Sequence, residues 1–252
     1  MKKIHLVIFT GILVVSFAIH FGRLVFFSLT DFNMLVPPNF IGLENYRIII
    51  RDDFIFPIAL RNTLVIYSLS AVIVGMVSLL IHEVLHKYYK TALYWCAAVL
   101  LVVSLCLAGG LLDPLLMDIW DSYRFTRPFE MVLVYFIIST LGVLLALLSI
   151  PYERLLPVSV KYLRLNLAFT LPIIIISFLE NSAMRITGFP SINYEAHTLY
   201  LHAWDRRNIR LEAGYAYALS VINVLVKTIL IASASVLMAV VSVVRSKIKN
   251  KL

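Results

Sequence analysis

The segment from Leu165 to Pro190 reads LNLAFTLPIIIISFLENSAMRITGFP and combines a long apolar run with one acid, Glu180. About 20 residues are needed to cross a bilayer as a helix, so the apolar run must be extended through Glu180 to span the membrane. Pro172 removes one backbone hydrogen bond and predicts a kink. An ionisable group at this depth is costly in hydrocarbon and is expected to face protein or a water-filled cavity. The segment therefore predicts a kinked membrane helix with a polar face.

The composition extends this interpretation to the whole chain. Of the 252 residues, 61% are apolar and only 14% are charged, which excludes an ordinary soluble domain and is typical of a polytopic membrane protein. Six segments are long and apolar enough to span, and they lie near Ile4–Leu29, Phe56–Ile81, Ala92–Leu116, Phe129–Ile150, Leu165–Ser182 and Ala216–Val244. We predict an all-α membrane protein with six transmembrane helices in a single domain, residues 1–252, that passes several times through the cell membrane.

The distribution of charge predicts the orientation of these helices. If the N-terminus lies inside, the outer loops hold no lysine, and the inner basic residues are Lys2, Lys3, Lys87, Lys90, Arg154, Lys161, Arg164, Arg245, Lys247, Lys249 and Lys251. The positive-inside rule then places both the N- and C-termini in the cytoplasm. The net charge of +8 is accordingly expected to contact anionic membrane lipid rather than nucleic acid.

A loop and a short helix follow the first predicted span. Residues 26–50 read FFSLTDFNMLVPPNFIGLENYRIII, in which Pro37-Pro38 favours extended chain and Leu43–Ile50 is amphipathic. This stretch resembles the first external loop of maltose-type ABC transporter permeases. Further matches occur in the order of that family, and they are Ala59–Leu64, Ser149–Pro151, Thr187-Gly188 with Pro190, and Gly214–Val221.

The resemblance implies a permease subunit of an ABC importer. With a second permease in a heterodimer, such a subunit forms the transmembrane path for a sugar or a similar polar solute. An extracytoplasmic solute-binding protein delivers the solute, and separate ABC ATPase subunits drive transport. The chain has no G-x-x-x-x-G-K-[ST] motif, so ATP hydrolysis is assigned to a partner chain. No enzymatic activity, cofactor or metal is predicted for this chain itself.

One loop departs from the pattern of the family. Between the fourth and fifth spans, Pro151–Arg164 reads PYERLLPVSVKYLR and lacks the Ala-Ala pair and the glycine of the family's coupling signature. Glu153, with Arg154 and Leu155, remains where the resemblance implies contact with the ATPase. Pro157 interrupts helix formation, so we expect this subunit to make the smaller ATPase contact of an asymmetric assembly. The alternative is a shortened coupling element that still docks.

Two of the predicted helices carry a polar face. In the last helix, polar residues recur at three- and four-residue spacing and form a stripe, and in the fifth helix they share one face. Hydroxyl, amide and amine groups suit a polyhydroxylated solute, whereas a purely structural stripe inside the bundle is the equal alternative. The candidate path residues are Thr170, Ser177, Glu180, Asn181, Tyr217, Ser220, Asn223 and Lys227.

Glu180 and Lys227 are expected to lie at the same depth. Counted from Arg164 and Arg245, at 1.5 Å per residue, both lie roughly 24–27 Å from the inner surface. Because an isolated charge at that depth is costly, we predict that the two side chains pair or share a polar cavity. The rival partners for Glu180 are Arg23 and Arg61.

The longest external segment is Asn181–Ala213, which is rich in aromatic residues and arginine. This enrichment suits contact with a protein and equally an aromatic belt at the membrane interface. We expect the segment to help receive the solute-binding protein. Within it, His197 and His202 are expected to be surface or interfacial residues.

Two other functions fit parts of the sequence. His82-Glu83-Val84-Leu85-His86 matches the H-E-x-x-H motif of zinc metalloproteases, in which two histidines one turn apart bind the metal and the glutamate acts as general base. A catalytic zinc needs a third protein ligand. The natural candidates fall on the opposite side of the membrane, and they are Asp113, Asp118 and Asp121. Glu153 is on the correct side but lies in a short loop flanked by prolines. The other alternative is a non-transporting scaffold subunit of a membrane complex, which the missing coupling signature favours.

Overall fold

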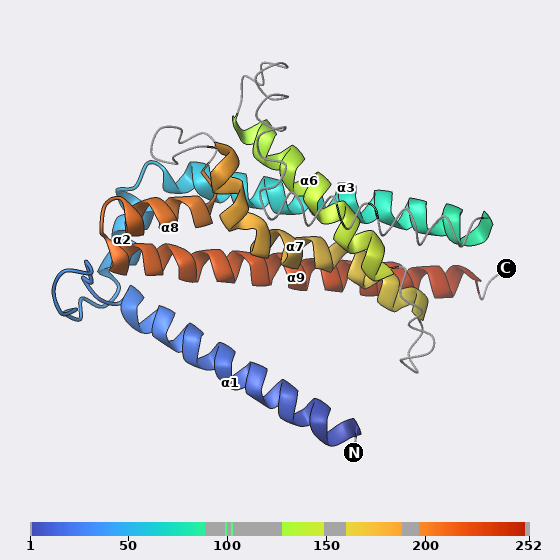
Figure 1. The fold of residues 1–252 in the computed structure, drawn as a ribbon, viewed down its shortest axis with the longest axis horizontal. Coiled ribbons are helices and arrows are strands. Elements are labelled where there is room, and N and C mark those ends of the chain that lie inside the picture. The colour runs from blue at the N-terminus through green and yellow to red at the C-terminus, as the bar shows by residue number, and fades with distance from the viewer. Residues whose placement is uncertain are drawn as a thin grey trace.

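The computed structural model describes residues 2–88, 99, 102, 128–148, 160–187 and 197–249. Its helices are α1 (Lys2–Ser28), α2 (Glu44–Arg51), α3 (Phe56–Tyr88), α6 (Pro128–Leu148), α7 (Val160–Thr187), α8 (Leu199–Asn208) and α9 (Ala213–Lys249) (Figure 1). These residues contain no strand, only an isolated bridge between Thr30 and Phe40, so the all-α prediction is confirmed for them. The predicted third span, Ala92–Leu116, lies outside the described residues apart from positions 99 and 102.

Two of the helices are long and apolar enough to cross a membrane. They cover Phe56–Val84 in α3 and Ala213–Val241 in α9. Shorter apolar helices run over Val14–Ser28 in α1 and Leu165–Ser177 in α7. These helices agree with a membrane protein, whereas the total of six spans and the cytoplasmic termini stay predictions.

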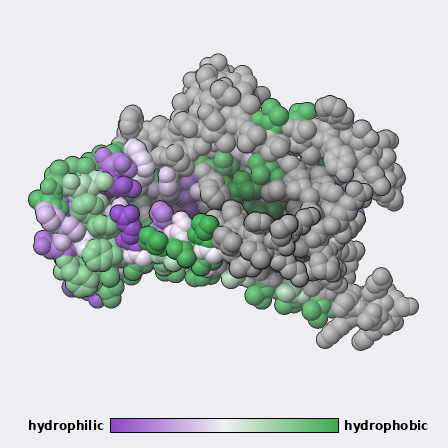
Figure 2. Space-filling model, turned by 60° about the horizontal axis from the view of Figure 1, so that its bottom comes forward, coloured by the Kyte–Doolittle hydropathy of each residue, from purple (hydrophilic) through white to green (hydrophobic). Residues whose placement is uncertain are grey.

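The helices form a bundle with a polar end. α3, α6 and α7 pack against one another, and α9 packs along α7. α8 lies on the N-terminal part of α9, and α1 meets α9 there and diverges from it toward the N-terminus (Figure 1). Hydrophilic side chains gather at the end of the molecule that carries α2 and α8, as Figure 2 shows, whereas the coloured surface beyond that end is mostly apolar. This distribution suits a bundle inserted in a bilayer with one end in water.

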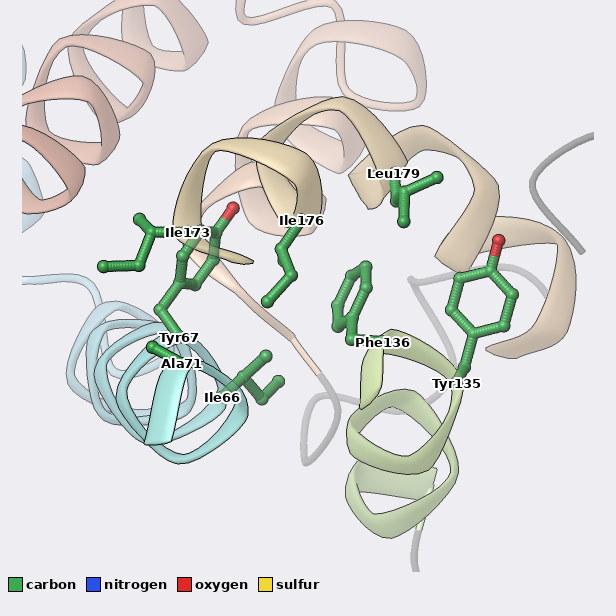
Figure 3. Packing of buried hydrophobic residues seen from close by; sticks show 8 residues of the cluster. All are labelled: Ile66, Tyr67, Ala71, Tyr135, Phe136, Ile173, Ile176 and Leu179. Carbon is green, nitrogen blue, oxygen red and sulfur yellow. The ribbon is translucent and has the colours of Figure 1, made fainter. Parts of the chain in front are cut away.

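A core cluster of buried residues joins α3, α6 and α7. Its members point into the space between the three helices in Figure 3, and they are Ile66, Tyr67, Ala71, Tyr135, Phe136, Ile173, Ile176 and Leu179. In lipid, helices associate through van der Waals packing and close backbone approach. Gly75 allows α3 to approach α7, because a Cβ at this position would lie 2.7 Å from the carbonyl oxygen of Ala168.

α7 is longer at its N-terminal end than the sequence predicts. It begins at Val160 and continues through Pro172, and its ribbon is bent in Figure 1. The last five residues of the predicted loop Pro151–Arg164 are therefore helical, which corrects the predicted end of that loop. Pro157 restricts the chain only at and before itself, and no glycine or proline follows it until Pro172.

The loop between α1 and α2, which we predict to be the first outer loop, is held to the helices by hydrogen bonds. Asn45 of α2 donates from Nδ2 to the carbonyl oxygens of Ser28 (2.9 Å) and Thr30 (2.8 Å). The amide of Gly214 donates to the carbonyl oxygen of Phe32 at 2.7 Å. A Cβ on Gly214 would collide with the carbonyl oxygen of Thr30, so glycine is required for this close approach. The predicted loop and short helix are thus present, and they are held against the start of α9.

Candidate functional site

A buried ion pair joins α7 to α9. Nζ of Lys227 lies 2.5 Å from Oε2 of Glu180, and the two side chains are 14% and 2% exposed. The prediction that these charges pair is confirmed. The rival partners are not used: Arg61 donates instead to Oδ1 of Asn62 at 3.3 Å, and Arg23 is exposed.

Tyr67 of α3 completes the surroundings of this pair. Its ring centroid lies 5.3 Å from Nζ of Lys227, a distance at which an ammonium is attracted to an aromatic face. Its hydroxyl lies 3.5 Å from Oγ of Ser177, which also donates to the carbonyl oxygen of Ile173. Sequence reasoning missed Tyr67, because nothing in α3 alone indicates which of its faces meets α7 and α9.

Two buried oxygen atoms at the ion pair accept no hydrogen bond from the described residues. Oε2 of Glu180 accepts from Lys227, but its Oε1 accepts no hydrogen bond from the described part of the protein, and neither does Oδ1 of Asn223. Both side chains are buried, and Tyr67 and Asn223 lie close enough to the Glu180 carboxylate to interact with it. Buried polar atoms nearly always have a partner, so these two oxygens can accept hydrogen bonds from hydroxyl groups of a solute.

The remaining candidate path residues divide into separate places. Thr170 is buried, and its hydroxyl donates to the carbonyl oxygen of Asn166 at 3.0 Å, so it is turned toward its own helix and away from the pair. Tyr217 and Ser220 lie nearer the N-terminal end of α9 and border a pocket, which we call the outer pocket because we predict that this end faces outward. The side chain of Asn181 lies outside the described residues.

The outer pocket has a volume of about 170 Å³ and is bounded by α1, α8 and α9. Its lining residues are Leu24, Tyr200, Ala203, Trp204, Arg207, Asn208, Ala216, Tyr217 and Ser220. The guanidinium carbon of Arg207 lies 5.6 Å from the ring centroid of Tyr217. The pocket therefore combines aromatic faces, hydroxyl and amide groups, and one cation.

A second buried group of charged side chains connects the start of α3 to α8 and α9. Oδ2 of Asp53 lies 2.6 Å from Nε2 of His202 and 3.4 Å from Arg206, and it accepts a hydrogen bond from the Tyr215 hydroxyl. Its Oδ1 accepts from the amide of Ile55 at 2.9 Å. Burial by itself raises the pKa of the Asp53 carboxyl, but the hydrogen bonds from His202 and Tyr215 outweigh it and hold the pKa well below its usual value. We refer to Asp53, His202, Arg206 and Tyr215 as the outer cluster.

The positions of the outer histidines differ from the prediction. His197 and His202 are 1% and 0% exposed, so the expectation of surface or interfacial residues is wrong. The cause is α8, which Thr198 begins as N-cap by accepting a hydrogen bond from the amide of Leu201. Asn62 also donates to the carbonyl oxygen of His197 at 2.9 Å and holds this segment against α3. The cap residue was the sequence signal for this helix.

Two other predicted sites are only partly described. The proposed ATPase contact residues Glu153, Arg154 and Leu155 lie outside the described residues. In the H-E-x-x-H motif, His82 is buried and its neighbour Glu83 is exposed, while the side chain of His86 is not described. Within the described part of the chain, no group of three His, Cys, Asp or Glu side chains is arranged to hold a metal ion.

Neither a protein-family model nor a curated protein matches this chain in sequence comparisons. The resemblance to maltose-type permeases therefore stays a prediction from motifs. The second basis for a functional interpretation is the arrangement of the described residues.

Proposed function

We propose that the chain is a permease subunit of an ABC importer. It crosses the cell membrane six times with both termini in the cytoplasm and forms, with a second permease subunit, the path of a sugar or similar polar solute. The other partners are separate ABC ATPase subunits, which Glu153, Arg154 and Leu155 help to contact, and an extracytoplasmic solute-binding protein. The ordered motifs that begin at residues 26–50 support this proposal.

The observation that carries the proposal is the convergence of polar side chains from two helices inside an apolar bundle. Glu180 of α7 and Lys227 of α9 pair, and Tyr67 of α3 lies over the ammonium group. Ionisable residues inside membrane helices are costly and mark solute or ion paths. The free acceptor oxygens of Glu180 and Asn223 are suited to the hydroxyl groups of a sugar.

The ion pair offers a way for solute to influence the conformation. In alternating access the two halves of a transporter rock around a site near the midplane. Relative movement of α7 and α9 would lengthen the contact between Glu180 and Lys227. Separating two buried charges is costly unless other groups hydrogen-bond to them. A solute hydroxyl that accepts from Lys227 or donates to Glu180 lowers this cost, so bound solute favours the separated arrangement.

Reconstitution tests the proposal. The chain is co-expressed with candidate permease and ATPase subunits from the same genome, and solute-stimulated ATP hydrolysis is measured in proteoliposomes with a candidate binding protein. We expect the subunits to purify together and a sugar to stimulate hydrolysis. A chain that associates with neither partner, or a complex whose hydrolysis responds to no sugar, would contradict the proposal.

Two sets of variants distinguish the rival roles. His82→Ala retains sugar-stimulated hydrolysis in a transporter, whereas zinc-dependent peptide cleavage that this variant abolishes would identify a protease. Alanine at Glu153, Leu155 and Leu156 tests the shortened loop. We expect only a modest decrease in ATP hydrolysis, because the partner permease makes the main contact. Complete loss with the complex intact would show that this loop couples after all.

A further inference from the structure

Two arginines near the end of α8 are neutralised by carboxylates. The guanidinium of Arg206 lies 3.4 Å from Asp53 and 2.8 Å from Glu212. Nε of Arg210 lies 3.4 Å from Oδ2 of Asp205, which is fully buried. These contacts hold α8 to its neighbours and leave both arginines with a structural anion.

Arg207 differs from both. Within the part of the chain that the structure describes, it pairs with no carboxylate, and its guanidinium lies over the ring of Tyr217 at the outer pocket. The aromatic face attracts the cation but accepts none of its in-plane N–H groups, which remain available for a planar anion. The pocket therefore contains one positive charge that pairs with no carboxylate of the described residues.

The other walls of the pocket suit the body of a sugar. Tyr200 and Trp204 place aromatic rings that can stack on the C–H face of a pyranose ring, whereas the ring of Tyr217 already contacts Phe27 and Arg207. Oγ of Ser220 donates to the carbonyl oxygen of Ala216 at 2.9 Å, which leaves its lone pairs as acceptors. Drug-sized ligand sites measure roughly 300–1,000 Å³, so a pocket of about 170 Å³ fits one ring or one acidic group.

We propose that the outer pocket is an entry subsite for an anionic, polyhydroxylated solute, with Arg207 binding its carboxylate or phosphate group. The assignment rests on the proposed function, because Tyr217 and Ser220 belong to the polar stripe of α9 that continues to Lys227. Arg207 belongs to α8 and Lys227 to α9, so Lys227 is a second cation further along the stripe, although Glu180 already pairs with it. Acidic sugars of the uronic acid type have the chemistry that this pocket recognises.

Binding of glucuronate and glucose to the full chain in phosphatidylcholine nanodiscs tests this assignment. Trp204 lines the pocket, and phenylalanine at Trp95 and Trp120 leaves it as the only fluorescent indole. We expect glucuronate to change this fluorescence at lower concentration than glucose does. Arg207→Gln should weaken glucuronate binding by about tenfold, which corresponds to roughly 1.4 kcal/mol, and leave glucose binding nearly unchanged.

Two further variants serve as controls. Arg210→Gln removes a neighbouring positive charge that already has Asp205 as its partner, and it should leave glucuronate binding unchanged. Arg207→Lys keeps the charge but loses the planar fork, so binding should fall between the wild type and Arg207→Gln. Equal loss in the Arg207 and Arg210 variants would indicate a general field effect and overturn the assignment.

Other outcomes also contradict the proposal. These are the absence of any glucuronate response, equal binding of glucose, and unchanged binding in Arg207→Gln. The same titration in nanodiscs containing phosphatidylglycerol tests a lipid headgroup as the source of the anion. If phosphatidylglycerol abolishes glucuronate binding to the wild-type chain but does not change the weaker binding by Arg207→Gln, the pocket is a lipid site. The solute assignment is then wrong.

Failure of the pocket and failure of the transporter are separable. A complex without sugar-stimulated ATP hydrolysis, in which glucuronate binding still depends on Arg207, would overturn the proposed function and leave the binding site. A working importer whose uptake and binding of glucuronate are unaffected by Arg207→Gln would overturn the subsite alone.

Discussion

Two buried groups of charged side chains lie at different levels of the bundle and differ in how completely they are hydrogen-bonded. In the outer cluster, Oδ2 of Asp53 contacts His202, Arg206 and Tyr215, and Oδ1 accepts from a backbone amide. At the other level, Oε2 of Glu180 accepts from Lys227, and its Oε1 accepts no hydrogen bond in the described structure. Both oxygens of the Asp53 carboxylate therefore accept hydrogen bonds, whereas one oxygen of the Glu180 carboxylate accepts none in the described structure.

The difference separates a structural role from a binding role. A saturated carboxylate has no acceptor left for a ligand, and removing it leaves several buried donors without a partner. A carboxylate with a free oxygen can exchange partners without losing the hydrogen bonds that remain. The outer cluster is accordingly expected to dominate stability, and the pair between α7 and α9 to dominate the response to solute.

The largest effect is expected from Asp53→Asn. The amide oxygen is a weaker hydrogen-bond acceptor for His202 and Arg206 than the carboxylate, and the buried negative charge is lost. The free energy of unfolding should therefore decrease by about 3 kcal/mol. The thermal midpoint of the purified protein measures this loss. Asp52→Asn is the matched control, because Asp52 is the adjacent and exposed acid and its loss should cost less than about 0.5 kcal/mol. Equal midpoints for the two variants would refute the structural role of the cluster.

The stability difference between the wild-type protein and Asp53→Asn should also depend on pH. Because the folded pKa of Asp53 is lowered, its contribution to stability is fully present above the unfolded pKa of about 3.9 and decreases as the pH falls below it. The advantage of the wild-type protein over Asp53→Asn should therefore be constant above about pH 5 and shrink progressively as the pH decreases from about 4 toward 2. A constant difference between their midpoints over that range would contradict the lowered pKa.

A smaller loss of stability is expected from Lys227→Met. Glu180, which is 2% exposed, is then left without its counter-ion, and the expected destabilisation is about 2 kcal/mol. The double variant Glu180→Gln with Lys227→Met removes both charges and should recover most of that loss. Additive losses in this double-mutant cycle would show that the two side chains do not interact.

Gly214→Ala tests how closely the first outer loop is held to α9. The added methyl group collides with the carbonyl oxygen of Thr30, and either the loop or the helix must shift, which should cost about 1.5 kcal/mol. Gly22→Ala in α1 is the control, because a Cβ there meets no atom within 4 Å. That variant should be neutral or slightly stabilising, since alanine favours helix. Similar midpoints for the two variants would contradict the close approach.

The smallest effect is expected from Tyr67→Phe. The change removes the long contact with Ser177 but keeps the ring over Lys227, so stability should decrease by about 0.5 kcal/mol. The thermal midpoint measures this decrease. Tyr67→Leu also removes the aromatic face, so its midpoint should be lower than that of Tyr67→Phe. Equal effects of phenylalanine and leucine would indicate that the aromatic face does not stabilise the ammonium.

The sequence predicts contacts between helices that are neighbours in the chain, but not contacts between residues far apart in it. The Glu180–Lys227 pair follows from the rise per residue of two antiparallel helices that are neighbours in sequence. The contact between Asp53 and His202 joins residues far apart in the chain, and no local pattern indicates it. The sequence also does not distinguish Arg207 from Arg206, because their different partners depend on the rotation of α8 against α9.

We propose that the Glu180–Lys227 pair acts in transport, whereas the outer cluster acts in stability. The decisive experiment is solute uptake by a reconstituted complex that carries Glu180→Gln together with Lys227→Met. We expect this complex to assemble and to unfold near the wild-type temperature, and yet to take up solute at least about tenfold more slowly, because neither charge remains to exchange partners. Uptake at the wild-type rate in that double variant would show that the pair has no role in transport.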